Sequence, residues 1–113
     1  MRRDYNTFLD DILESINRIE NYTSSISLNE FMNNNMIQDA VVRNLEIIGE
    51  AVKNIPDSFR HRFPSIEWKS IAGLRDILIH SYFGIDQIIV WDIVENKIPQ
   101  LKEQITMVMN SLK

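Results

Sequence analysis

Apolar residues recur every three or four positions along nearly the whole chain, and no stretch alternates as a half-buried strand would. This period places the apolar side chains of each stretch on one face of a helix. In chain order, the predicted apolar faces are Tyr5, Phe8, Ile12, Ile16 and Ile19; Ile37, Val41, Leu45, Ile48 and Val52; and Trp91, Val94, Ile98, Leu101, Ile105, Val108 and Leu112. The pattern therefore predicts an all-α protein.

Turn-forming and capping residues divide these stretches into separate helices. Ser27 and Glu30 have the spacing of a capping box, which predicts that a helix begins there. Pro56 is expected to end the helix before it. Ser65 is predicted to cap the following helix, and Gly84 to stop it.

The last apolar face keeps its phase across Pro99. This continuity predicts one long C-terminal helix, capped by Asp86 and kinked near Pro99, rather than two helices. Long amphipathic helices with short connections predict an antiparallel bundle of four to five helices. A chain of 113 residues suits one core, so residues 1–113 are expected to form a single domain.

Composition excludes several kinds of chemistry. The chain has no cysteine, which excludes disulfides, thiolate metal sites and a cysteine nucleophile. No apolar run reaches the roughly 18–20 residues of a membrane helix. The amino-terminal residues start basic but lack the uninterrupted apolar segment of a signal peptide. We therefore expect a cytoplasmic protein with no membrane association.

The charge is acidic overall but uneven. A net charge of −4 argues against bulk electrostatic capture of nucleic acid. The segment 53–75, however, holds five basic side chains and two acidic ones: Lys53, Arg60, Arg62, Lys69 and Arg75 against Asp57 and Glu67. This local excess of positive charge permits a phosphate-binding site on an acidic protein.

Four polar side chains interrupt an apolar helix in the stretch RDILIHSY, residues 75–82. Asp76 and His80 share a helix face, as do Arg75 and Tyr82, whereas Arg75 and His80 lie about 140° apart on an ideal helix. Histidine exchanges protons near neutral pH, and an arginine guanidinium binds phosphate oxygens. Together they suit metal-independent RNA cleavage, in which the ribose 2′-hydroxyl attacks the neighbouring phosphate.

One copy of this motif holds one histidine, whereas such cleavage works best with both a general base and a general acid. A two-fold dimer would supply the second His80, and the surplus apolar surface of so small a bundle predicts a dimer. The spacing Arg-x4-His also occurs in ion pairs at the edge of a bundle. The motif by itself leaves this structural alternative open.

Three blocks follow one another along the chain: AVVRNLEIIGEAVKNIP, FPSIEWKSIAGLRDILIHSYFGID and IVWDIVENKIPQLKEQI. In this order they resemble the HepT-like toxins of the HEPN superfamily, over almost the whole chain. The resemblance implies a HEPN-like dimer that acts as a metal-independent endoribonuclease, with the motif from Arg75 to His80 at the dimer cleft. Asp76 then occupies a position where many relatives carry asparagine. We expect Lys69 and Arg62, from the basic segment, to bind the RNA with Arg75.

The resemblance also implies a partner. HepT-like toxins are usually encoded beside a minimal nucleotidyltransferase antitoxin, which in the characterised type transfers AMP from ATP to a tyrosine that matches Tyr82. The implied protein is the toxin of a type II/VII-like pair, without cofactor or metal, as a homodimer or a larger hetero-oligomer with the antitoxin. The alternative is a catalytically weak helical module that docks the nucleotidyltransferase. A nucleotide sensor has less support, because no Gly-rich phosphate loop is present.

Overall fold

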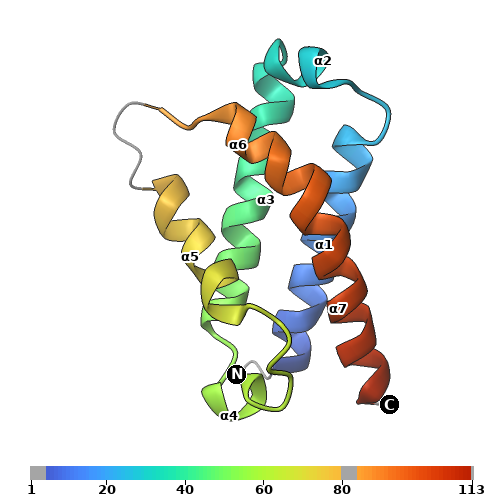
Figure 1. Cartoon of the computed structure of the whole chain (residues 1–113), viewed down its shortest axis with the longest axis vertical. Coiled ribbons are helices and arrows are strands. Elements are labelled where there is room, and N and C mark those ends of the chain that lie inside the picture. The colour runs from blue at the N-terminus through green and yellow to red at the C-terminus, as the bar shows by residue number, and fades with distance from the viewer. Residues whose placement is uncertain (1–4, 80–83, 113) are drawn as a thin grey trace.

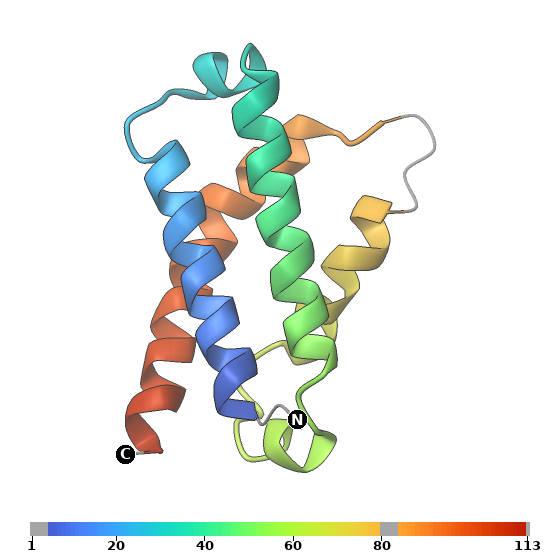
Figure 2. The same ribbon diagram turned by 180° about the vertical axis from the view of Figure 1, so that it is seen from behind.

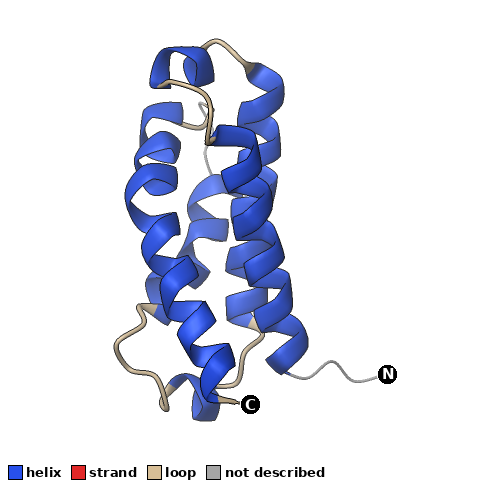
Figure 3. Ribbon diagram, turned by 90° about the vertical axis from the view of Figure 1, so that its right-hand side faces the viewer, coloured by secondary structure: helices blue, strands red, loops and turns tan. Residues whose placement is uncertain are grey.

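A computed structural model describes residues 5–79 and 84–112, without the side chains of Arg75 and of residues 77–79. Every regular element in this part of the chain is a helix (Figure 3). In chain order these are α1 (Tyr5–Thr23), α2 (Leu28–Met32), α3 (Asn35–Lys53), α4 (Asp57–Arg60), α5 (Trp68–Ile79), α6 (Gln87–Asp92), the π-helical turn η1 (Ile93–Lys97) and α7 (Ile98–Ser111). The predicted all-α class is confirmed. None of the described helices is long and apolar enough to cross a membrane.

The long helices run alternately up and down the molecule (Figure 1). α3 lies between α1 and α5 in the front and back views and contacts both, while α7 packs against α1 (Figure 2). This arrangement is the antiparallel bundle predicted from the short connections. Because α5 packs mainly on α3, it forms one edge of the bundle.

Local capping bonds determine where two of the helices begin. The Ser27 hydroxyl accepts a hydrogen bond from the Glu30 N–H, and the Glu30 carboxylate accepts one from the Ser27 N–H, both at 3.1 Å. The Asp86 carboxylate accepts a hydrogen bond from the Ile88 N–H at 3.0 Å. Both predicted caps are therefore confirmed.

The prediction that Ser65 caps α5 is wrong, because the helix begins three residues later, at Trp68. The intervening chain buries Ile66, which is 3% exposed. The Trp68 indole N–H also donates to the carbonyl oxygens of Arg60 and Phe63, at 3.1 and 3.0 Å. These tertiary contacts tie the first residue of α5 to α4 and the turn after it, and they override the local signal of Ser65.

The last helix is continuous from Gln87 to Ser111 and contains the π-helical turn η1 just before Pro99. Proline has no N–H, and its ring collides with the carbonyl group four residues earlier in a regular α-helix. A π-turn relieves this conflict without ending the helix. The predicted single long helix is confirmed, and it changes direction between α6 and α7 (Figure 1).

The predicted apolar faces meet in the centre of the bundle. Their buried members are Ile12, Ile16, Ile19, Val41, Leu45, Ile48, Val52, Val94, Ile98, Leu101, Ile105 and Val108. An ion pair of 2.7 Å between Lys102 and Glu20 joins α7 to α1 at the rim. This core holds α3 in place, and α3 in turn supports α5.

Candidate nucleic-acid interface

Two residues of the predicted motif, Arg75 and Asp76, lie on the described part of α5. Arg75 lies in the second half of this helix, and the side chain of Asp76 is exposed. His80 and Tyr82 lie outside the described residues. The expected meeting of these groups in one cleft therefore stays a prediction.

Lys69, Gly73 and Asp76 lie on one face of α5, since they follow one another at spacings of four and three residues. Lys69 and Asp76 are exposed, and a Cβ atom at Gly73 would meet no other atom within 4 Å. This face, called the open face below, is thus exposed at both ends and low at its centre, where Gly73 is half-buried. Glycine inside a helix costs about 1 kcal/mol relative to alanine, and no contact at this position requires it.

By its position in the sequence, Arg75 does not belong to the open face of α5. It follows Ile71 and Ala72 by four and three positions, and both of these are half-buried against the core. Around the axis of an ideal helix, Arg75 lies about 120° from Lys69. Arg75 and Lys69 therefore occupy different positions around the α5 backbone, and their joint binding of RNA stays a prediction.

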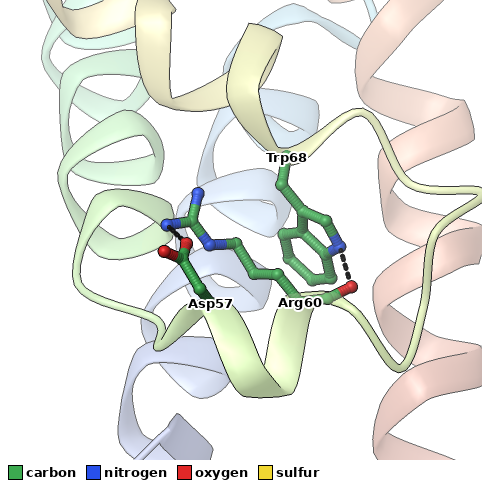
Figure 4. A network of polar contacts seen from close by, with 3 residues as sticks. All are labelled: Asp57, Arg60 and Trp68. Atoms are coloured by element: carbon green, nitrogen blue, oxygen red, sulfur yellow. Dashed lines mark hydrogen bonds and ion pairs between the residues drawn. The ribbon is translucent and has the colours of Figure 1, made fainter.

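A hollow of ≈ 810 Å³ opens where α4, the turn after it and the start of α5 meet. Its lining includes Arg60, His61 and Lys69, opposed by Asp57 and Glu67. The guanidinium of Arg60 forms an ion pair with Asp57, and its backbone carbonyl accepts the indole N–H of Trp68 (Figure 4). This hollow is called the α4–α5 hollow below.

The sequence patterns predict no functional role for His61, which is exposed on this lining. The available signal was the run RHRF, in which basic and aromatic residues alternate. The short turn between α4 and α5 places His61 on the lining of the same hollow as Lys69, eight residues later in the chain. Only the way this turn folds back brings the two together.

Arg62 is exposed just after α4, and two aromatic rings hold its side chain. Its guanidinium carbon lies 5.3 Å from the ring centre of Phe59 and 5.7 Å from that of Phe63. Phe59 itself stacks on Tyr5 of α1, with ring centres 4.4 Å apart. These contacts restrict a positive charge to the surface next to His61, although Arg62 does not line the α4–α5 hollow.

Comparison with known proteins adds a family relationship. Residues 12–108 match the family model described as "Ribonuclease HepT-like". The chain is 51% identical over 107 residues to "Putative RNase MJ1380" of Methanocaldococcus jannaschii, covering 95% of this chain and 98% of that protein. It is 46% identical over 102 residues to "Probable ribonuclease HepT" of Thermococcus cleftensis, covering 90% and 93%.

In a longer relative, the region similar to this chain makes up about half of the protein. The chain is 47% identical over 112 residues to "Gamma-glutamylcyclotransferase and putative RNase MJ0434" of Methanocaldococcus jannaschii. This match covers 99% of the present chain and 50% of that protein. No solved structure gives a significant match.

Proposed function

The chain belongs to the HepT-like ribonuclease family, and from this premise we propose that it is a metal-independent endoribonuclease acting in a cleft between two copies of itself. The match over residues 12–108 carries this proposal. It gains support from the position of Arg75 and Asp76 on α5, the edge helix of the bundle. An edge helix is accessible both to a long substrate and to a second copy.

In the proposed reaction, the ribose 2′-oxygen attacks the adjacent phosphorus atom, and the bond from phosphorus to the 5′-oxygen of the next nucleotide breaks. One His80 accepts the proton of the 2′-hydroxyl, and the partner subunit's His80 donates a proton to the departing 5′-oxygen. Arg75 binds the non-bridging phosphate oxygens and stabilises their additional charge in the transition state. The products are a 2′,3′-cyclic phosphate and a 5′-hydroxyl.

The proposed dimer forms through α5. This helix packs mainly on α3, which leaves the apolar side chains of Ile71 and Leu74 only half-buried. A two-fold contact would bring the same helix of both copies together and would cover these apolar side chains. The dimer would then be the catalytic unit, alone or within a larger complex with an antitoxin.

The negative charge of Asp76 bears on both candidate functions of the chain. Its exposed carboxylate precedes His80 by four residues, so it can orient the imidazole. The same negative charge opposes the approach of a phosphate, as does the net charge of −4. These charges favour a second candidate function, a catalytically weak helical module that docks a nucleotidyltransferase.

RNA cleavage in the presence of EDTA tests the first proposal against the second. We expect the purified chain to cut single-stranded RNA at the same rate with EDTA and with Mg²⁺, because proton transfer by histidine needs no metal. Mass spectrometry of the fragments is expected to find 2′,3′-cyclic phosphate ends. Cleavage that stops in EDTA and returns with Mg²⁺ would contradict metal independence, whereas no cleavage in either buffer would favour the docking module.

We further propose that the chain is the toxin of a toxin–antitoxin pair and that Tyr82 is its control point. The Tyr82 phenol oxygen attacks the α-phosphorus of ATP bound to a nucleotidyltransferase antitoxin, and pyrophosphate leaves. The added adenylyl group carries bulk and a negative phosphate to a position two residues from His80. It would occupy the site of the RNA phosphate and pair with Arg75, which blocks substrate.

Intact-mass measurement after co-expression with the neighbouring nucleotidyltransferase gene tests this control point. We expect the chain to gain AMP units and to lose RNA cleavage, whereas the Tyr82→Phe variant gains none. Tyr22→Phe is the matched control, since Tyr22 is an exposed tyrosine at the end of α1 and remote in sequence from the motif. An unchanged wild-type mass, or AMP still present on Tyr82→Phe, would overturn the assignment.

A further inference from the structure

The α4–α5 hollow lies on the motif helix but outside the motif. Lys69 and Ser70 of its lining belong to the first turn of α5, and Lys69 precedes Asp76 by seven residues. At a rise of about 1.5 Å per residue, this separation is roughly 10 Å along the helix. Nucleotides of a stacked strand follow one another at roughly 3.4 Å, so a bound strand could reach both places.

The floor of the hollow is apolar and held in place. Trp68 and Ile66, which are 6% and 3% exposed, contribute to it. The Trp68 indole N–H donates to the carbonyl oxygens of Arg60 and Phe63, which ties the start of α5 to the turn after α4. The bond to Arg60 and the ion pair of Arg60 with Asp57 are drawn in Figure 4. A ligand that enters such a site does not have to order the protein first, which favours binding.

The rim of the hollow carries groups that recognise nucleotides. Lys69 offers an ammonium group, His61 an aromatic ring and Ser70 a hydroxyl, and all three residues are exposed. Proteins that bind single-stranded RNA combine cationic groups for the backbone with aromatic rings on which bases stack. The size of the hollow, ≈ 810 Å³, lies in the range of about 300–1,000 Å³ that small ligands occupy.

The open face connects the hollow with the motif. Between Lys69 and Asp76 this face carries only two small residues, Ala72 and Gly73, and a Cβ atom added at Gly73 would have free space around it. A strand can therefore lie close to the backbone of α5 along this path. A larger side chain at position 73 would stand between the hollow and the turn that carries Asp76.

From these observations we propose that the α4–α5 hollow is a subsite for one unpaired nucleotide of the RNA, roughly three nucleotides along the strand from Asp76. Lys69 binds the phosphate of this nucleotide, and the ring of His61 stacks on its base. The strand then follows the open face past Gly73 to the motif. Because a paired base cannot enter the hollow, the subsite selects single-stranded RNA. This inference rests on the proposed ribonuclease function.

Binding in a salt series tests the subsite, with His80→Ala in every chain so that RNA is not cut. The probe is a short fluorescent single-stranded oligoribonucleotide. Adding Lys69→Ala is expected to weaken binding several-fold and to make the slope of log K against log [salt] shallower by about 0.7, the value for one phosphate contact on a single strand. The matched control is Lys53→Ala, an exposed lysine in the last turn of α3 that does not line the hollow, and it should leave the slope unchanged.

Substrate length and pairing give the second measurement. His61→Ala is expected to raise KM severalfold for single-stranded RNA and to leave KM for a dinucleotide, which is too short to reach the hollow, unchanged. Equal salt slopes for Lys69→Ala and Lys53→Ala, or equal affinity for single-stranded and base-paired RNA, would overturn the subsite. Cleavage by the unmodified chain together with such equal slopes would leave the ribonuclease function standing, whereas a chain that binds no RNA would overturn both.

Discussion

Replacing His80 with alanine is expected to lower the rate of RNA cleavage by about 10²–10⁴-fold, because the variant loses the group proposed to accept and donate the proton. Helix content by circular dichroism and the oligomeric state by light scattering should not change. The measurement is the cleavage rate at saturating RNA, so that a change in binding does not contribute.

The other histidine of the chain provides the matched control for this experiment. His61 lies in the α4–α5 hollow rather than in the motif, so His61→Ala should keep kcat and alter only KM. This difference separates a group that acts on the reacting atoms from one that holds the substrate. Cleavage by His80→Ala at the rate of the unmodified chain would show that His80 is not the acid or base.

Replacing Leu45 with alanine is expected to lower the free energy of unfolding by roughly 3 kcal/mol, since the side chain is 0% exposed in the middle of α3. For a chain of this size such a loss lowers Tm by roughly 10 °C. Urea or thermal denaturation followed by circular dichroism measures both quantities. We expect this loss of stability to affect the candidate site as well, because α5 packs mainly on α3.

Leu28→Ala is the matched control for core packing. Leu28 is 43% exposed at the start of α2, so the same change of side chain should alter the free energy of unfolding by about 0.5 kcal/mol or less. Similar losses for the two variants would mean that Leu45 does not occupy the core described here.

Several features of the fold could be predicted because they depend on residues that are close in sequence. The capping box of Ser27 and Glu30 and the cap at Asp86 each involve groups no more than three residues apart. The phase of the apolar face across Pro99 likewise predicted a continuous last helix, which a π-turn allows. Local geometry was sufficient in these cases, whatever the helices pack against.

The start of the motif helix could not be predicted in this way. Ser65 has the local chemistry of a cap, but α5 begins at Trp68, whose indole bonds to the carbonyl groups of Arg60 and Phe63. The burial of Ile66 is likewise a result of packing rather than of its neighbours in sequence. The preference of one residue was too weak to compete with these contacts.

Some features of the candidate site likewise follow from the sequence, whereas others depend on the tertiary structure. The sequence by itself determined that Arg75, Asp76, His80 and Tyr82 follow one another at spacings that suit a nucleic-acid site, because spacing is a property of the chain alone. Only the tertiary structure decided that α5 is the edge helix, that there is free space next to Gly73, and that the turn after α4 encloses a hollow beside Lys69. Such features depend on how whole helices pack, and residues many positions apart contribute to that packing together.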